Sequence, residues 1–405
     1  MLLTLSWRNL WRNPKRTLII LTAVVISAWT MLILSAFSRG MIDSTLSNSL
    51  NTLTGHIQIQ APLYREDPVV ENRIPDIAPV KAVLERHLPP GSLWSSRIQV
   101  PGVASNARHS KGVGIVGIEP DREPDISFYG DTLSEGQFLK SGDDIGIVIG
   151  KALADTFETK PGRKLVLMTQ GSDRETASRA FRIRGIFRAE MEATEKQYVF
   201  ISLTAAQKLL NIDSAVTNIC IKLPEPASLD QVTRAVSQDL PPELSVLPWT
   251  ELLPLLKGYL EMFDSFMLLW YLVVFTAMAF GLVNTMLMAV LERTREFGLL
   301  KALGMKPVWI VRNVLTESFI LLTVGIIVGN LLGFATVHAF SGGIDLSFLA
   351  RGSEFVGMGN VVVPLLFLED LFSANAVILV FGLLVCLYPA IKAGRITPVE
   401  AMTQN

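Results

Sequence analysis

The sequence predicts an α-helical membrane protein with four transmembrane helices, both termini in the cytoplasm, and a large extracytoplasmic α+β domain between the first and second helices. Three observations support this fold class. The 405 residues are 50% hydrophobic and only 18% charged, and their mean hydropathy of +0.40 is high for a soluble protein. Several runs are apolar over roughly the 20 residues that a bilayer requires. Lysine and arginine gather in short segments that flank these runs.

The transmembrane helices are predicted from the apolar runs and oriented by the basic residues. The predicted spans are residues 17–38, 265–291, 313–340 and 371–391. The first is too long for a signal peptide and lacks a small-residue cleavage site. The basic segments are residues 1–16, the link 292–307 and the tail 392–405, and the positive-inside rule assigns all three to the cytoplasm. The extracytoplasmic parts are then residues 39–264 and the link 341–370.

Three helices are expected next to the bilayer. Residues 1–16 place Trp7 and Trp11 on one helical face and arginines on another, as in an interfacial helix, although an ordinary charged flank fits equally. Residues 39–60 are predicted to continue the first span outward as a stalk that leads into a first strand. Residues 249–264 form a matching stalk helix before the second span. The alternative is that both helices lie separately on the outer surface.

The outer domain is predicted to consist of two subdomains. Strand–helix–strand patterns at its two ends, within residues 61–110 and 213–248, indicate one α/β layer. Residues 111–212 form a β-rich insertion in that layer. The predicted elements of the α/β layer are strands at Gly55–Gln60, Ser96–Val100, Asn218–Lys222 and Leu244–Leu247 and helices at Pro79–Leu88 and Leu229–Leu240. Those of the insertion are strands at Val113–Ile118, Ile145–Ile149, Lys164–Met168, Ala180–Phe187 and Gln197–Ile201 and helices at Gly150–Phe157 and Thr204–Leu210.

Motifs of cofactor and catalytic chemistry are weak. Residues 112–117 fit GxGxxG, but a dinucleotide site needs a strand before the motif and a helix within it, whereas this motif itself has the pattern of a strand. Residues 146–151 resemble a phosphate loop that is one residue short. The four histidines are scattered without metal spacing, Cys220 and Cys386 do not suggest a disulfide framework, and a net charge of −1 gives no case for nucleic acid. We expect no catalytic residues, bound cofactor or metal in this chain.

The cytoplasmic link between the second and third spans is the most informative segment. Its opposite charges lie three residues apart, Gly298 allows close approach of another backbone, and Gly304 and Pro307 end the helix. Phe297, Leu300, Leu303 and Gly304 are expected on one face. An ordinary basic hairpin explains these features as well. The candidate residues for contact with a soluble partner are Glu292, Arg293, Arg295, Glu296, Phe297, Gly298, Leu300, Lys301, Leu303 and Gly304.

A resemblance decides between these readings. The segment from Glu292 to Gly304, ERTREFGLLKALG, resembles the signature of the FtsX/MacB/LolC–LolE family of ABC transporter permeases. The tail YPAIKAGRITPVEAM, from Tyr388 to Met402, and LSEGQFL and VIGKALA in the outer domain are also similar to this family. The resemblance implies a bacterial inner-membrane protein whose α/β layer is porter-like and whose insertion is Sabre-like.

The same resemblance implies that a separate chain supplies the energy by hydrolysing ATP. A permease of this family dimerises, with an identical copy or a sister permease, and docks on a cytoplasmic ABC ATPase that binds ATP and Mg. The ATPase pushes residues 292–307 as a coupling helix, and the outer domain moves, which the family calls mechanotransmission. MacB carries its ATPase fused before the first span. This chain starts only a few residues before that span, so we expect its ATPase in trans.

Three functions remain open at this point. The segment GHIQIQ and the overall length resemble the lipoprotein-release branch, LolC and LolE. The alternatives are an FtsX-like regulator of a periplasmic cell-wall hydrolase, or a MacB-like efflux subunit that works with a periplasmic adaptor. The lipoprotein branch would need an acyl-chain groove and a periplasmic acceptor. Flexible apolar side chains where the stalk meets the second span could line such a groove or face membrane lipids: Met262, Phe263, Phe266 and Met267.

Glu317 is a carboxylate within the third predicted span. Such residues are costly and usually functional. It lies about five residues from Arg312, close to the cytoplasmic interface. A structural ion pair with a basic residue of the link and a role in coupling are both open.

Overall fold

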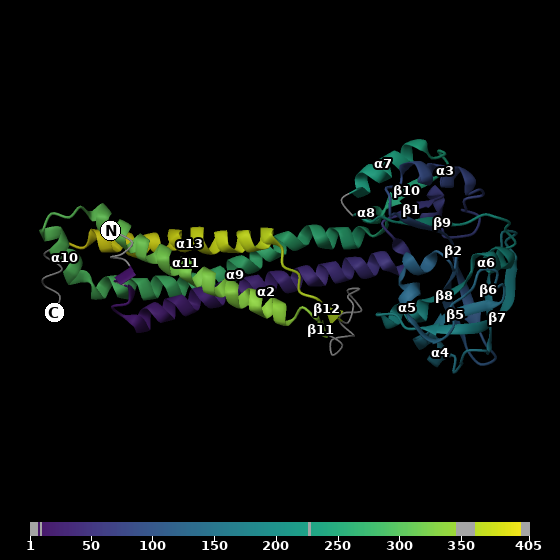
Figure 1. Ribbon diagram of the computed structural model, residues 1–405, viewed down its shortest axis with the longest axis horizontal. Helices are drawn as coiled ribbons and strands as arrows, with labels where there is room; N and C mark the ends of the chain where they lie inside the picture. Colours follow the sequence, from purple (N-terminus) through teal and green to yellow (C-terminus); the bar gives the residue numbers. More distant parts are fainter. Residues whose placement is uncertain (1–6, 9, 226–227, 346–360, 398–405) are drawn as a thin grey trace. The chain divides into compact units, whose positions relative to one another are not determined.

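A computed structural model describes residues 7–8, 10–225, 228–345 and 361–397 of the chain (Figure 1). The described residues divide into two compact units. We call residues 7–43, 259–345 and 361–397 the helical unit, and residues 44–258 the sheet unit. Residues 1–6 and 9 of the predicted interfacial helix, residues 346–360 of the second extracytoplasmic link and the tail beyond residue 397 lie outside the described residues.

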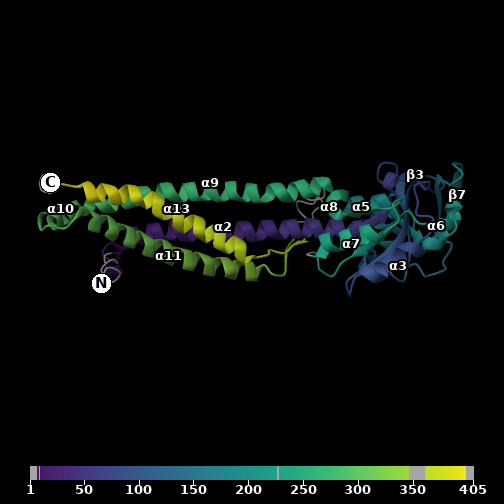
Figure 2. The same cartoon turned by 90° about the horizontal axis from the view of Figure 1, so that it is seen from above.

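Four long helices make up most of the helical unit. Each has the length and hydropathy to cross a bilayer, which confirms the predicted fold class, and they run lengthwise beside one another (Figure 2). Their bounds are α2 at Pro14–Ser49, α9 at Pro254–Glu292, α11 at Pro307–Ala339 and α13 at Leu368–Arg395. A two-stranded ribbon of β11 (Ile344–Asp345) and β12 (Val361–Val362) precedes α13.

Small residues on α11 allow the helices to approach closely. A Cβ atom at Gly329 would lie 2.6 Å from the Cβ of Ala28 on α2, and one at Gly325 would lie 2.5 Å from Val24. Because apolar burial gives little drive for association within lipid, such close packing is what holds membrane helices together. Gly382 of α13 likewise lies against Leu322 of α11.

Both predicted stalk helices are shorter than expected at the ends that lie within the sheet unit. Helix α2 ends at Ser49 and passes into the π-helical turn η1 (Leu50–Thr54), in which Leu53 is left-handed with φ of 67°. The predicted helix 249–264 breaks after α8 (Trp249–Leu252), because Leu253 has φ −121° and ψ 64°. The following Pro254 explains this break, since proline disfavours the helical conformation of the residue before it.

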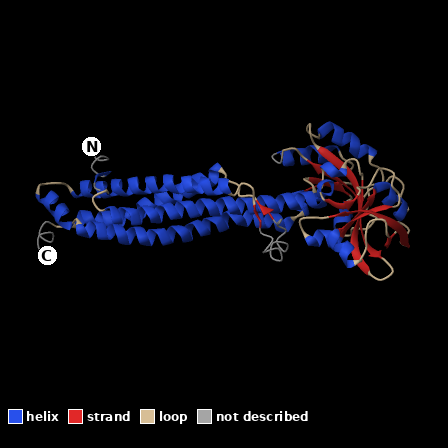
Figure 3. Cartoon of the chain, turned by 60° about the horizontal axis from the view of Figure 1, so that its bottom comes forward, coloured by secondary structure: helices blue, strands red, loops and turns tan. Residues whose placement is uncertain are grey.

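The sheet unit contains ten strands in one mixed sheet, in the order β10-β1-β9-β2-β3-β8-β5-β7-β4, with β6 beside β2 and β7. Figure 3 shows these strands with helices around them. The strands are β1 (Ile57–Gln60), β2 (Leu93–Ser105), β3 (Ser110–Ile118), β4 (Leu133–Gly136), β5 (Gly146–Gly150), β6 (Lys164–Gln170), β7 (Thr176–Phe187), β8 (Tyr198–Ser202), β9 (Asn218–Lys222) and β10 (Ser245–Pro248). The helices are α3 (Ala78–His87), α4 (Lys151–Thr156), α5 (Glu192–Gln197), α6 (Leu203–Leu210) and α7 (Leu229–Asp239).

Strand β2 joins the two predicted subdomains. Its first half pairs with β9 of the α/β layer, and its second half pairs with β3 and β6 of the predicted insertion. The sequence predicted only Ser96–Val100 as extended, whereas the strand continues through Pro101 and Gly102 to Ser105. Gly102 is instead a point of close approach: a Cβ atom there would lie 2.4 Å from Ile115 and 2.8 Å from the Met168 carbonyl oxygen.

The glycine-containing motifs lie in the core of the sheet. Residues 112–117 belong to β3, which pairs with β2 and β8. Residues 146–150 form β5, a fully buried strand between β7 and β8. Val113, Ile147 and Ile149 are buried in one cluster with Ile57 and Ile59 of β1, and Val116 and Val148 are buried in a second cluster. Gly114 and Gly117 lie close against Tyr198 and Ala206, so they serve packing within the sheet unit.

A pH dependence of the sheet unit is expected from His56. Its Nδ1 accepts a hydrogen bond from the Leu223 backbone N–H at 3.1 Å, and burial, with a smaller effect of Lys222, lowers the pKa of the ring. The folded unit thus favours the neutral ring, so stability is complete above the ordinary pKa and falls as the pH drops below about 6.5. Urea unfolding of the full chain should show this loss between about pH 7 and pH 5.

The variant His56→Asn should flatten this dependence, because an amide oxygen can accept the same hydrogen bond without titrating. His109→Asn is the matched control, since His109 is exposed. Equal pH slopes in wild type and His56→Asn would show that another group is responsible.

Candidate functional site

The cytoplasmic link folds as a short helix, α10 (Thr294–Ala302), between α9 and α11. Arg293 separates it from α9 with φ −98° and ψ 14°. Gly304 follows the helix with φ of 91°, a left-handed conformation that glycine adopts without strain. Pro307 then begins α11, where its missing N–H costs nothing. The helical part is therefore shorter than the predicted segment 292–307.

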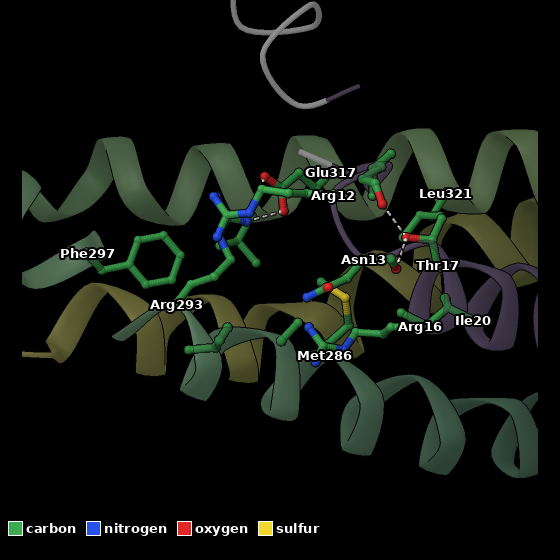
Figure 4. A pocket seen from close by; sticks show the side chains of 14 residues that line it. Arg12, Asn13, Arg16, Thr17, Ile20, Met286, Arg293, Phe297, Glu317 and Leu321 are labelled. Carbon is green, nitrogen blue, oxygen red and sulfur yellow. Dashed lines mark hydrogen bonds and ion pairs between the residues drawn. The ribbon is translucent and has the colours of Figure 1, made fainter. Parts of the chain in front are cut away.

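Ion pairs attach α10 to its neighbours. The Arg293 guanidinium donates to both oxygens of Glu317 on α11, at 3.0 and 2.9 Å, and to Glu296 at 3.2 Å. Glu296 also pairs with Arg12, which precedes α2. Figure 4 shows Arg293 extended toward Glu317. Of the two roles open for Glu317, the structure thus contains the ion pair with the link. We call Arg12, Arg293, Glu296 and Glu317 the ion-pair brace.

Opposite charges balance around the small cavity beside the brace. The cavity has a volume of about 50 Å³, and its wall includes Arg16, which pairs with Glu292. Partial burial tends to raise the pKa of Glu296, but hydrogen bonds from Arg12 and Arg293 outweigh it and hold the pKa below its ordinary value. Glu296 therefore stays ionised at neutral pH. Each arginine around the cavity is paired with a glutamate, and these pairs connect the link to the neighbouring helices.

A second attachment ties α10 to the end of α13. The Lys301 ammonium donates hydrogen bonds to the backbone carbonyls of Gly394 and Ile396, the latter at 2.6 Å. These carbonyls lie at the C-terminus of a helix, where a cation is favoured by the helix dipole. Together with the brace, this contact connects α10 to both α11 and α13.

The predicted single apolar face of α10 is wrong. Phe297 is buried at 2% exposure and Gly298 is also buried, whereas Leu303 is 77% exposed. Leu300 is half-buried, and Gly304 and Arg295 are exposed. The helix ends at Ala302, so Leu303 and Gly304 no longer follow its period. The large apolar side chains that α10 and the turn after it expose are Leu299, Leu303 and Met305, which we call the coupling patch.

Leu299 and Met305 were missed by the sequence reasoning. Leu299 is 61% exposed, because it lies two positions after the inward Phe297 and so on the opposite side of the helix. The adjacent pair Leu299–Leu300 was the available signal, since two consecutive apolar residues on a short surface helix cannot both point inward.

The four candidate cargo-lining residues do not form one surface. Phe263 and Met267 are each only 8% exposed and belong to the core of the helical unit. Met262 and Phe266, at 73% and 54%, are exposed. Residues four apart share a helical face, so α9 turns one pair inward and the other pair outward.

Comparisons with known proteins cover both units. Residues 17–239 match the MacB-like periplasmic core domain, and residues 268–398 match the FtsX-like permease C-terminal domain. The chain is 22% identical over 313 residues, 74% of each chain, to the lipoprotein-releasing system transmembrane protein LolC of Neisseria meningitidis serogroup B. It is 20% identical over 428 residues, 99% of each chain, to LolE of Haemophilus influenzae. The periplasmic region of MacB from Actinobacillus actinomycetemcomitans aligns with a TM-score of 0.36 and 13% identity, over 50% of this chain and 93% of that one.

Proposed function

Because this chain belongs to the family of ABC transporter permeases with a MacB-like periplasmic core and an FtsX-like C-terminal domain, we propose that it converts ATP hydrolysis by a separate ATPase into motion of its periplasmic domain. The chain is a multi-pass inner-membrane protein with its sheet unit in the periplasm. The observation that carries the proposal is the coupling patch: three exposed apolar side chains on α10 and the turn that follows it, in a link that ion pairs attach to α11.

The mechanism follows from the attachments of α10. The ATPase binds ATP and Mg and holds the coupling patch. When it closes, it displaces α10, and α10 moves α11 through the ion-pair brace and α13 through Lys301. Direct attachments of this kind resist independent movement of the helices. The role of this chain is mechanical, and the chemistry of hydrolysis belongs to the ATPase.

The cargo is a lipoprotein or another hydrophobic molecule of the inner membrane. Support comes from similarity to LolC and LolE, whose names describe lipoprotein release, at 20–22% identity over most of the chain. A second permease, identical or a sister, covers apolar residues that α9 leaves exposed, such as Met262, Phe266 and Phe280. A periplasmic acceptor receives the cargo.

Affinity purification of the tagged full chain from native membranes tests this function. An ATP-hydrolysing chain should co-purify with the wild type. It should be lost, at least tenfold, in Leu299→Asp/Leu303→Asp, because carboxylates cannot enter an apolar contact without losing their hydration. Both residues are exposed, at 61% and 77%, so the permease itself should stay folded. Lys306→Asn, an exposed residue beyond the patch, is the control.

The outcomes separate the motor from the cargo. An ATPase that binds the double variant as well as the wild type would contradict the coupling patch, and its absence from the wild type would contradict the motor. Lipid-modified proteins in the wild-type preparation support lipoprotein release. A cell-wall hydrolase or an efflux adaptor in their place would contradict lipoprotein release as the function. The proposed coupling to an ATPase would still hold.

A further inference from the structure

An apolar groove lies between α11 and α13. Its volume is about 700 Å³. Its apolar wall consists of Val308, Val311, Leu315 and Phe319 from α11 and Val380, Leu383, Leu384 and Leu387 from α13. The two helices are antiparallel, because Gly394 lies near Pro307 while Gly382 lies near Leu322. The groove is therefore bounded by the first part of α11 and the second half of α13.

The length of the groove matches one leaflet of the membrane. Its residues on α11 run from Val308 to Phe319, which at 1.5 Å per residue is about 17 Å. The hydrocarbon core of a bilayer is about 30 Å thick, so one leaflet takes up roughly half of that. Helix α11 begins at Pro307 on the cytoplasmic side, and the groove thus lies in the cytoplasmic leaflet.

Arg312 is the only charged residue among the described residues that line this groove. It lies one turn from Val308, near the cytoplasmic end, and its guanidinium stacks 5.5 Å from the centre of the Trp309 ring. Within the described part of the chain, no carboxylate pairs with it. Thr316, one turn further along α11, adds a hydroxyl to the wall. A cation beside an interfacial tryptophan at the mouth of an apolar groove matches the amphipathic form of a phospholipid.

We propose that this groove binds an anionic phospholipid of the cytoplasmic leaflet, with an acyl chain against Leu383 and Leu384 and the headgroup phosphate on Arg312. The guanidinium suits the phosphate because it donates two parallel hydrogen bonds and retains its charge. Lys392 lies at the same end of α13 and adds positive potential there. This site is separate from the coupling patch and does not depend on the ATPase.

A transmembrane helix of another chain is a poorer occupant. It would place apolar side chains against Arg312, whose guanidinium would then lose its hydration without gaining a phosphate. A lipid supplies an apolar chain for the wall and an anion for the arginine at once.

Native mass spectrometry of the full chain, titrated with phosphatidylglycerol, tests the site. The wild type should retain phosphatidylglycerol at one tight site per chain. Arg312→Gln and the groove-filling Leu384→Trp should each weaken this retention about tenfold, as expected for loss of a charge-assisted contact or of the apolar space. The matched controls are Lys306→Gln, at the same end but outside the wall, and Leu331→Trp, exposed elsewhere on α11. Both should bind as the wild type does.

Equal retention by all variants would mean that the lipid belongs to the general boundary layer, and the proposal would be wrong. Equal weakening by Lys306→Gln and Arg312→Gln would also overturn it, because diffuse charge would then explain binding. Disulfide capture of Leu384→Cys by a second chain in the membrane would show a protein helix in the groove. A photoreactive acyl chain of phosphatidylglycerol that labels the α13 wall in the wild type, and labels it less in Arg312→Gln, supports the site directly.

Discussion

Replacing Arg293 by leucine is expected to destabilise the helical unit by about 3–5 kcal/mol, the range observed when one partner of a buried ion pair is removed. The Arg293 side chain is 18% exposed and that of Glu317 is 9% exposed. Without the guanidinium, the carboxylate of Glu317 loses the positive charge that offsets it, and an uncompensated carboxylate on a transmembrane helix is costly. Thermal unfolding of the purified chain should therefore begin at a distinctly lower temperature.

The double variant Arg293→Leu/Glu317→Leu separates stability from coupling. Removing both charges should restore most of the thermal stability, since an apolar pair of similar volume often replaces a buried ion pair at little cost. The permease should nevertheless no longer change the rate of ATP hydrolysis by the bound ATPase, because α10 has lost its attachment to α11. Lys306→Leu, a surface change, should alter stability by less than about 0.5 kcal/mol. A double variant that regains full coupling would show that the brace only stabilises the helical unit.

The sequence predicted the helices and strands well wherever a single physical signal dominated. Long apolar runs could only be transmembrane helices, and alternation or short apolar runs between turn signals identified β1 and most strands of the insertion. It failed where tertiary contacts override local preference. Strand β2 continues through Pro101 and Gly102 because neighbouring strands pack closely there. The opposite error occurred at Leu253, where Pro254 broke a helix that the apolar pattern had extended.

The candidate site was predicted in position but not in orientation. The charged residues of the link gave its place next to the membrane, and Glu317 lay close enough in sequence to meet them. The period of a nine-residue helix is too short to decide which face is buried, so Phe297 and Leu303 were placed together. The participation of Arg12 and Gly394 could not be seen either, because they come from opposite ends of the chain.

A second ion pair, wholly inside the sheet unit, holds the end of the helix that begins in the membrane. Arg97 and Glu123 are both fully buried, and their two hydrogen bonds measure 3.1 and 2.6 Å. Arg97 also donates to the Leu53 carbonyl oxygen at 2.6 Å. That carbonyl lies at the turn that follows α2, where positive charge is favoured by the dipole of the helix. Arg97 thus joins the end of α2 to strand β2.

Arg97→Met is expected to destabilise the sheet unit by about 3–5 kcal/mol, because Glu123 is left as an unpaired buried carboxylate. The double variant Arg97→Met/Glu123→Leu should recover most of that loss, because no buried charge is left unpaired and the Leu53 carbonyl keeps the hydrogen bond that Gln58 Nε2 donates at 3.1 Å. Urea unfolding gives both values. Arg122→Met is the control, since Arg122 is partly exposed and pairs with Glu119 on the surface; it should cost less than about 1 kcal/mol. If Arg97→Met costs no more than this control, then water reaches the pair in solution and the end of α2 is not held by a buried charge.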